Sequence, residues 1–455
     1  MKFCALLVYL VTIASLNLPP PTSRTYKILS RSAPSKGSAA GSLTDLPSFQ
    51  RLENIWDQVK HDSLPPPPKF IFSTPPPTHS TSTAAPTDVI VAGGTLGIIQ
   101  AVALLLSGHG VTTIEAAPRI AGREQEWNIS EHELEAVKRI AERACQELNK
   151  TMDWGSVIGT KFDGCRAGFK NSETEQPLLD TPETNNYFAS GGYEVFVPSV
   201  LNIGVKPDAL LTMFRELFVE LGGKLLEGTK ISAIHSPPEG LVSVVTGGNE
   251  VLSARLLLDC TGNASPLTRD LRRNERPDGI CVVVGTCAGG FDPGKNKDGD
   301  IIYTNTPITD VGGSQTQYFW EAFPVSTSNG PEVADSDVKT TYMFTYLDAS
   351  ENRPSLTDYF EDYWRLLPIY QKGVDIDKLD IKRTLFAFFP TYRNSPLQVP
   401  YARVISLFDA SGIQVSHLYL LCICICICRR ARTFHLTQPV AGAYRAPCRL
   451  VALEL

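Results

Sequence analysis

Residues 88–97 read Asp-Val-Ile-Val-Ala-Gly-Gly-Thr-Leu-Gly and constrain the fold more than any other stretch of the chain. A short apolar run, a glycine-rich turn and an alanine-rich run predict a strand, a tight turn and a helix. Val111–Ile114 predicts a second strand, and Glu115 follows it, 18 residues after Gly97. Glycines let the backbone approach a pyrophosphate, a helix N-terminus offers free N–H groups, and an acid at this spacing accepts ribose hydroxyls. The stretch therefore predicts the start of a dinucleotide-binding βαβ unit, with a strand and helix that only pack as the alternative.

One position departs from the G-x-G-x-x-G fingerprint. Gly94 and Gly97 occupy the second and third glycine positions of this fingerprint, but Ala92 stands where the first glycine is expected. The turn must therefore accept a methyl group at the end of its strand.

Composition excludes several classes of function. A length of 455 residues allows about two to four domains. The net charge of −6 gives no sign of a nucleic-acid groove, and the seven histidines show no metal-ligand spacing. We therefore expect neither a nucleic-acid partner nor a metal site. Five cysteines are expected to be buried small residues in a reducing compartment rather than a disulfide framework, namely Cys145, Cys165, Cys260, Cys281 and Cys287.

The N-terminus has the composition of a targeting region. Phe3–Leu16 is an apolar run after Lys2, too short for a comfortable membrane span, and it resembles the apolar core of a secretory signal. No acidic residue occurs before Asp45, a composition typical of plastid or mitochondrial transit peptides. Both interpretations hold together if the signal is bipartite. We expect residues 1–43 to direct the protein to a plastid (chloroplast), with the secretory pathway as the alternative.

Residues 44–87 are expected to form a Pro/Ser/Thr-rich linker. Pro65–Pro68 and Pro75–Pro77 are polyproline runs, and Leu46–Asp62 is long enough for one short helix. The folded body is then expected to start at Asp88. The whole N-terminal region is predicted to be disordered.

Two helices follow the first βαβ unit. Ser130 and Glu133 form a capping box for a helix with one apolar face. Residues 207–221 carry an apolar stripe that ends at two glycines, so this helix is expected to pack against the core.

Residues 170–190 are polar and irregular and predict a mobile insert. Strand-like runs are expected at Val195–Val200, at Lys224–Ile234 with Val242–Val245 as a hairpin, and at Leu256–Leu258, which ends in Asp259-Cys260-Thr261-Gly262.

A second, sheet-based domain is expected from Asp278 onward. Ile280–Gly285, Thr316–Pro324 and Lys339–Tyr346 are rich in Val, Tyr, Phe and Thr, which is typical of antiparallel strands. A helix is expected at Ser355–Tyr370. The chain therefore belongs to the α/β class.

Taken together, these motifs resemble a lycopene cyclase-like FAD/NAD(P)-binding protein of plants and algae. That group lies in the larger superfamily of flavin monooxygenases, halogenases and geranylgeranyl reductases. The resemblance covers about residues 88–414 and is carried by Ala92–Gly97, Glu115, Gly122–Ser130, Asp259–Gly262 and the Phe-Asp-Ala-Ser-Gly run at 408–412. It implies a glutathione-reductase-type FAD-binding Rossmann domain with an antiparallel-sheet substrate domain.

The resemblance also implies roles for individual residues. FAD would be the cofactor, with its pyrophosphate at Gly93, Gly94, Thr95 and Gly97 and the departure at Ala92. Glu115 would hold the adenosine ribose, Thr261 and Gly262 would approach the nucleotide, and Asp409 would contact the ribityl or pyrophosphate portion. A functional interpretation of Arg123 sets it against the cofactor phosphates; the alternative is a surface loop in which it only anchors the chain.

A candidate catalytic carboxylate lies in the second domain. The segment Gln317–Phe323, with Glu321 among four aromatic residues, resembles the Phe-Leu-Glu-Glu-Thr segment of lycopene cyclases, in which a carboxylate serves as acid–base. Desolvation among aromatics would raise the pKa of Glu321 and make it a proton donor. The alternative is a strand glutamate that points to solvent. Alternation favours burial because it places Glu321 on the face of Phe319 and Phe323.

The chain changes character after Gln414. The resembling proteins continue with a glycine-rich loop and a helix, whereas this chain continues with Val-Ser-His and a Cys-Ile repeat at 422–428. The repeat is compatible with a strand, a soft-metal tract or a low-complexity accident. We hypothesise a translated intron, because Gln-Val-Ser can be encoded by CAG-GTG-AGT, a splice-donor sequence. Residues 415–455 would then be an aberrant tail, and sequencing the spliced transcript across codon 414 tests this.

These observations predict six segments and three functional alternatives. The expected segments are a targeting peptide (1–43), a linker (44–87), an FAD-binding domain with part of the substrate region inserted (88–277), an antiparallel-sheet substrate domain (278–390), a return to the FAD-binding domain (391–414) and the tail (415–455). The favoured function is an FAD-dependent oxidoreductase acting on a small apolar, isoprenoid-like substrate such as a carotenoid. The alternatives are redox-neutral cyclisation with reduced FAD and Glu321, and a truncated non-catalytic product unable to hold FAD. Contact with a membrane surface follows only by analogy with apolar substrates, and the oligomeric state stays open.

Overall fold

The computed structural model describes residues 23–32, 45–77, 81–82, 85–123, 125–170, 194–273, 275–304, 309–327, 330–333, 336–371, 373–394 and 397–411. Most of the expected insert at 170–190 and the whole tail at 415–455 lie outside these residues, as does most of the expected targeting peptide. No helix among the described residues is long and apolar enough to cross a membrane.

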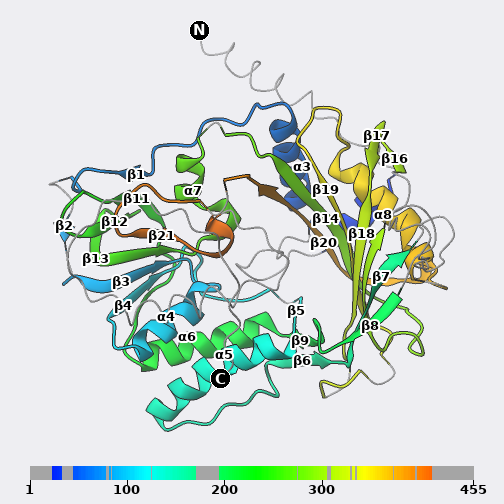
Figure 1. The fold of residues 1–455 in the computed structure, drawn as a ribbon, viewed down its shortest axis with the longest axis horizontal. Helices are drawn as coiled ribbons and strands as arrows, with labels where there is room; N and C mark the ends of the chain where they lie inside the picture. The colour runs from blue at the N-terminus through cyan, green and yellow to red at the C-terminus, as the bar shows by residue number, and fades with distance from the viewer. Residues whose placement is uncertain are drawn as a thin grey trace, which may run out of the picture.

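A largely parallel sheet forms one lobe of the molecule (Figure 1). Its central order is β1-β11-β12-β13-β3-β4-β10, and β2 and β21 pair with β13. The core strands β3, β4 and β13 are parallel, and β12 runs antiparallel to both of its neighbours, β11 and β13. The bounds are β1 (Ile71–Phe72), β2 (Thr81–Ser82), β3 (Thr87–Ala92), β4 (Val111–Ile114), β10 (Lys224–Leu226), β11 (Ile231–His235), β12 (Val242–Thr246), β13 (Glu250–Asp259) and β21 (Val404–Ser406).

The predicted βαβ unit is confirmed. Strand β3 leads through the glycine turn into α4 (Gly97–Leu106), and β4 pairs in parallel with β3. The apolar run of β3 is continuous because both of its faces are buried. Val89 and Val91 face the core formed with α4, α5 (Glu131–Leu148) and α6 (Pro207–Glu220). Ile90 and Ala92 face the opposite core, under α7 (Pro266–Leu271).

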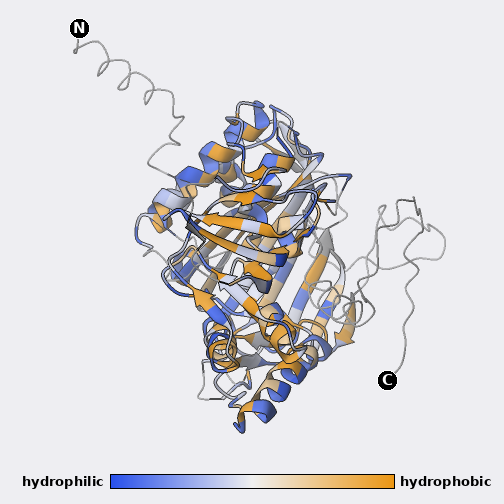
Figure 2. Cartoon of the chain, turned by 90° about the vertical axis from the view of Figure 1, so that its left-hand side faces the viewer, coloured by the Kyte–Doolittle hydropathy of each residue, from blue (hydrophilic) through white to orange (hydrophobic). Residues whose placement is uncertain are grey.

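The amphipathic helices predicted from sequence are also confirmed. The Ser130 backbone N–H donates to the Glu133 carboxylate over 2.7 Å and begins α5. Helix α6 buries Leu210, Phe214 and Leu217. In the side view of Figure 2, the helices carry alternating hydrophilic and hydrophobic bands. This pattern is expected when one stripe of a helix packs on a sheet.

A second sheet forms the other lobe. Its order is β20-β14-β19-β18-β15-β7-β8, antiparallel as predicted except for the parallel pair β15 and β7. Helix α8 (Leu356–Tyr370) and helix α3 (Leu46–Lys60) cover one face (Figure 1). The strands are β7 (Gly164–Lys170), β8 (Glu194–Pro198), β14 (Gly279–Gly289), β15 (Gly299–Thr304), β18 (Tyr318–Pro324), β19 (Lys339–Leu347) and β20 (Asp380–Thr391).

Short elements complete the described part of the chain. They are α2 (Arg24–Leu29), β5 (Trp127–Ile129), β6 (Ile158–Lys161), β9 (Ile203–Val205), β16 (Thr309–Val311), β17 (Ser314–Thr316), η1 (Gly262–Ala264), η2 (Ile376–Lys378) and η3 (Phe408–Ser411). Strands β5, β9 and β6 form a small antiparallel sheet, and β16 pairs with β17.

One predicted hairpin is wrong in its first half. Strand β10 pairs in parallel with β4 at the far edge of the first sheet, and only β11 pairs with β12. The chain between β10 and β11 therefore crosses from one edge of the parallel strands to the other side of β13. The alternation of apolar and polar residues continues from β10 into β11, so the sequence pattern does not show that these are two separate strands.

The expectation that residues 44–87 are a linker before the folded body is also wrong for most of that stretch. Trp56 in α3 is fully buried, and its Nε1–H donates to the Pro354 carbonyl over 2.8 Å. Strand β1 pairs with β11 in the first sheet. Pro65–Pro68 joins α3 to β1 and therefore connects the two lobes. Helix α2, inside the predicted targeting peptide, buries Leu29 in the same core as α3.

Candidate functional site

The glycine turn closes so tightly that two of its positions exclude a side chain. Gly93 has φ +92°, and a Cβ there would lie 2.5 Å from the Cys260 carbonyl oxygen. A Cβ on Gly97 would lie 2.9 Å from Val91 Cγ1, because α4 packs directly on β3. These contacts explain why glycine is needed at both positions. Gly93 lets the turn pass close to the end of β13, and Gly97 lets α4 pack closely on β3.

Ala92 fits the turn without strain. Its side chain is buried in the core under α7, and its carbonyl accepts the Cys260 N–H over 2.7 Å. The next residue, Gly93, donates its N–H to the Ile114 carbonyl over 2.9 Å. The end of β3 is thus tied to both neighbouring strands, and the methyl group at the departure is accommodated by the core.

Glu115 fastens the turn from the end of β4. One carboxylate oxygen accepts the Gly94 N–H over 2.8 Å, and the other accepts the Ala117 N–H over 2.8 Å. A Cβ on Gly94 would collide with the Ile120 side chain at 2.4 Å and approach this carboxylate to 3.1 Å. A carboxylate offers about four lone-pair sites, so two acceptor positions stay open for hydroxyl donors.

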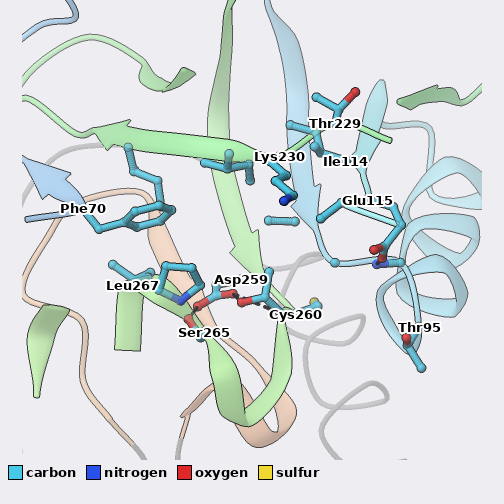
Figure 3. Close-up of a pocket in the computed structure, with 18 residues that line it drawn as sticks. Phe70, Thr95, Ile114, Glu115, Thr229, Lys230, Asp259, Cys260, Ser265 and Leu267 are labelled. Atoms are coloured by element: carbon cyan, nitrogen blue, oxygen red, sulfur yellow. Dashed lines mark hydrogen bonds between the residues drawn. The ribbon is translucent and has the colours of Figure 1, made fainter. Parts of the chain in front are cut away.

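A cavity of about 330 Å³ lies at the carboxyl ends of these parallel strands. This is the edge at which ligands bind in open α/β sheets. Ala92, Gly93, Gly94, Thr95 and Glu115 line it, as predicted for a nucleotide site, together with Thr261. Figure 3 shows Glu115 and Thr95 at one end of the cavity and Phe70 and Leu267 at the other. The remaining lining residues are Ile114, Ala116, Thr229, Lys230, Ile231, Ile234, Asp259, Cys260, Ser265 and Pro266.

Asp259 organises the turn that follows β13. Its carboxylate accepts from the Thr261 N–H over 3.0 Å, the Thr261 hydroxyl over 2.6 Å and the Ser265 hydroxyl over 2.6 Å (Figure 3 shows the Ser265 contact). Burial raises the pKa of Asp259 although these donors act against the shift. Ser265 also caps α7 by accepting the Thr268 N–H. Gly262, with φ +77°, takes the chain around this corner but does not line the cavity.

Asp409 lies beside this corner. It belongs to η3, which packs on η1, and its Oδ2 accepts the Asn263 side-chain amide over 3.4 Å. Desolvation raises the pKa of Asp409 above its usual value. The structure thus brings Asp409 to the turn of Thr261 and Gly262. Gly412, the last residue of the motif, lies outside the described residues.

Arg123 lies away from the cavity. Its guanidinium donates to the backbone carbonyls of Gln125 over 3.1 Å and Glu126 over 3.2 Å. It also hydrogen-bonds the Tyr342 hydroxyl and lowers the pKa of Tyr342, against a larger rise from burial. The neighbouring Gln125 amide donates to Thr340 over 2.6 Å, so this loop connects the first lobe to β19. Contact of Arg123 with cofactor phosphates stays a prediction.

Glu321 is buried, as alternation predicts. Its side chain lies on the face of the second sheet that is opposite α8, between Ile301 on β15 and Tyr342 on β19. Its residue exposure is 9%, and desolvation raises its pKa to about 7. The adjacent Trp320 points the other way and stacks on Tyr363 and Tyr370 of α8. At neutral pH the Glu321 carboxyl is therefore divided between its acidic and its basic form.

An aromatic surface adjoins Glu321 on the same face. Phe319 stacks on Phe344 with ring centroids 4.4 Å apart and on Tyr346 with centroids 5.4 Å apart. Tyr346 is 63% exposed, so this surface runs from solvent towards the buried carboxyl. Flat apolar molecules gain most from such a surface because their faces can stack on the rings.

Sequence reasoning missed the residues of the apolar end of the cavity. Phe70 follows a proline run, where no alternation marks a strand, and Lys230 follows an ordinary turn. Leu267 and Pro266 gave a usable signal, because Ser265-Pro266 is a typical helix start. The five cysteines that were predicted to be buried are confirmed as buried. No cluster of metal-ligating side chains occurs in the part of the chain that the structure describes.

Solved structures with a related arrangement have low sequence identity to this chain. The halogenase PltM is 15% identical, with 77% of this chain and 70% of that chain covered and a TM-score of 0.48. FqzB is 12% identical, with 76% and 75% covered and a TM-score of 0.48. A geranylgeranyl bacteriochlorophyll reductase-like protein from Thermoplasma acidophilum is 14% identical, with 72% of each chain covered and a TM-score of 0.45.

No family model matches the chain, and no curated protein matches it. At these values the likeness to solved structures assigns neither a family nor a ligand.

Proposed function

We propose that this protein is an FAD-dependent oxidoreductase resembling lycopene cyclases, which acts on an apolar, isoprenoid-like substrate in a plastid. The observation that carries the cofactor assignment is the Glu115 carboxylate bound to the Gly94 N–H at the end of a 330 Å³ cavity. An acid at the end of the second parallel strand, facing a glycine turn at a helix N-terminus, is the arrangement that dinucleotides require.

The residues present fit FAD. At Gly94 a Cβ would meet Ile120 and Glu115, so a glycine is needed for the turn to bring its N–H to the Glu115 carboxylate at the cavity. Thr95 and Thr261 bring hydroxyl groups to the same cavity. Glu115 would hold the adenosine ribose, and Asp409 would contact the ribityl or pyrophosphate portion from the corner at Gly262. When bound, FAD supplies hydride-transfer chemistry or, in its reduced form, a negative charge near the substrate.

Glu321 supports a role for this chain's own residues at the substrate. Its buried carboxyl, with a pKa raised to about 7, can hold a proton at neutral pH and release it to an apolar substrate. The aromatic surface of Phe319, Phe344 and Tyr346 would orient that substrate and exclude water from the carboxyl.

A second candidate is redox-neutral cyclisation, and Glu321 is the observation that favours it. Protonation of a carbon–carbon double bond needs an acid in a site without water, which is the state that desolvation gives Glu321. In this reaction Glu321 donates a proton to one carbon–carbon double bond, a second double bond attacks the resulting cation to close the ring, and the Glu321 carboxylate takes the proton that the ring cation loses as its new double bond forms. The carboxyl therefore returns to its starting form without net oxidation.

Flavin binding by the full chain tests the cofactor assignment. The purified protein is expected to be yellow and to release FAD on denaturation, identified by chromatography. Gly94→Ala is expected to lose the flavin because the new Cβ meets Ile120 and Glu115. Gly110→Ala is the matched control, since a Cβ there meets only ordinary contacts at 3.5 Å and beyond. A folded, colourless wild-type protein that takes up no added FAD would contradict the proposal and favour the non-catalytic alternative.

Glu321→Gln separates the two candidate reactions in a flavin-loaded protein. Acyclic carotenoid substrates are incubated with reduced FAD, and the products are separated by chromatography. Loss of cyclised product with retained flavin supports proton donation by Glu321. Turnover that instead consumes reducing equivalents and is insensitive to this substitution supports the oxidoreductase.

A further inference from the structure

We infer that Phe70, which comes from the N-terminal segment before the glycine turn, forms the wall against which the adenine of the cofactor packs. This inference rests on the proposed function and goes beyond it, because it assigns part of the cofactor site to residues before Asp88. Phe70 is 8% exposed and lines the cavity of Glu115 and Gly94.

The cavity has a polar end and an apolar end. Glu115 and Thr95 lie at the polar end, where ribose and phosphate groups find acceptors and N–H donors (Figure 3). Phe70 and Leu267 lie at the opposite end. Ile231, Ile234 and Pro266 extend this apolar lining. A nucleoside has the same division, since its sugar is polar and its base presents flat apolar faces.

Phe70 is held in place by backbone contacts on two sides. Its N–H and that of Ile71 donate to one oxygen of the Asp270 carboxylate, over 2.7 Å and 3.0 Å. Its carbonyl accepts the Ile234 N–H over 2.8 Å, where β1 begins to pair with β11. Asp270 lies on α7, the helix that starts at the Asp259 turn. The backbone at Phe70 is therefore fixed to the helix that follows the Asp259 turn, and Asp259 also lines the cavity.

The charge state of Asp270 is consistent with this anchoring role. Desolvation alone would raise its pKa, but the N–H groups of Phe70 and Ile71 and the Arg273 guanidinium bring the pKa below its usual value. A carboxylate that stays ionised keeps both N–H groups of the segment bound at neutral pH. The segment thus stays docked under the conditions in which a nucleotide would bind.

Recognition by an aromatic wall predicts discrimination between flavins. Stacking of a base on an aromatic side chain is a favourable contact that does not depend on hydrogen-bonding pattern. FAD and ADP carry an adenine, whereas FMN does not. Removing the Phe70 ring should therefore weaken FAD and ADP and leave FMN unaffected.

The experiment measures the affinity of the full-length protein, stripped of flavin, for FAD and FMN by fluorescence quenching and for ADP by calorimetry. Phe70→Ala is expected to raise the Kd for FAD and ADP by about tenfold or more and to leave the Kd for FMN unchanged. Phe72→Ala is the matched control: Phe72 lies two residues after Phe70, in β1, and stacks on His235, with ring centroids 5.1 Å apart, outside the cavity lining. Its Kd for FAD is expected to equal that of the wild type.

Two further variants keep the test decisive if Phe70→Ala folds poorly. Phe70→Leu keeps an apolar side chain without a ring and is expected to weaken FAD binding, whereas Phe70→Tyr keeps the ring and is expected to restore it. Wild-type affinity for FAD in Phe70→Leu overturns the inference alone, as does an equal loss of FAD and FMN. A wild-type protein that binds neither FAD nor ADP overturns the inference and the proposed function together.

Discussion

At the scale of single residues, Glu321 is a buried acid whose surroundings act on its pKa in one direction only. Its pKa rises from the usual 4.5 to about 7, and desolvation is the cause. Because no opposite charge among the described residues offsets this shift, the ionised form costs free energy in the folded protein. Such a group is rarely kept in a sheet for stability, which is why it is a candidate for function.

This shift predicts how stability depends on pH. Between pH 4.5 and about 7 the folded state holds the Glu321 proton more tightly than the unfolded state, so stability falls as pH rises through that window. Glu321→Gln removes the effect. Relative to the variant, the wild type is expected to lose about 3 kcal/mol of unfolding free energy between acid and alkaline ends of this window, measured by urea unfolding.

Glu351→Gln serves as the control, because Glu351 is exposed and should leave the pH profile as it is. If wild type and Glu321→Gln show parallel profiles, the carboxyl is ionised in the folded protein and the proton-donor role fails.

The sequence predicted residues whose partners are close along the chain, and it missed residues whose partners are distant. Ser130 and Glu133 interact within one helical turn, and Ala92 to Glu115 form one continuous motif, so local patterns predicted them. Glu321 was placed on the correct face by alternation, but its burial depends on Tyr342, a neighbour on another strand. Phe70 could not be predicted, since its role depends on pairing with Ile234 and on the Asp270 carboxylate, both distant along the chain.

At the scale of elements, α3 shows how a proline-rich region can hide a core helix. Six of its fifteen residues are apolar, and Phe49 and Trp56 are fully buried against α8 and β20. The Glu53 carboxylate accepts the Leu356 N–H over 2.9 Å at the start of α8. An acid at a helix N-terminus stabilises it, so α3 also completes the end of its neighbour.

Trp56→Ala tests whether α3 belongs to the core. Removing a fully buried indole is expected to reduce the free energy of unfolding by about 3–5 kcal/mol, because a cavity is left and the Pro354 carbonyl loses its donor. Ile55→Ala, one position away and 40% exposed, should change it by less than about 1 kcal/mol. Equal unfolding curves for the two variants would mean that α3 does not pack as described.

At the scale of the whole molecule, one N-terminal segment contributes to both lobes. Helices α2 and α3 bury Leu29, Phe49 and Trp56 with the second sheet, whereas Ile71 enters the core of the first. A domain boundary drawn at Asp88 from composition alone therefore removes part of each core. Composition could not show this, because surface linkers and packed prolines use the same residues.

Truncation tests this organisation directly. A chain starting at Ser23 keeps α2, α3 and β1 and serves as the reference. A chain starting at Asp88 is expected to be insoluble or to unfold at a much lower urea concentration, because it exposes the apolar surfaces that α3 and β1 cover. If the two truncated chains have equal solubility and equal unfolding midpoints, residues 23–87 do not contribute to either core and form a linker.

The proline run between α3 and β1 has a mechanical consequence. Four prolines in an extended conformation span about 12 Å and resist both bending and shortening. Pro65–Pro68 lies between α3, which packs on the second sheet, and β1, which pairs in the first, so it limits how far the two sheets can move relative to each other. A hinge movement that changes this span would have to undock one of its anchors. Substrate entry would then rely on side-chain rearrangement rather than on separation of the lobes.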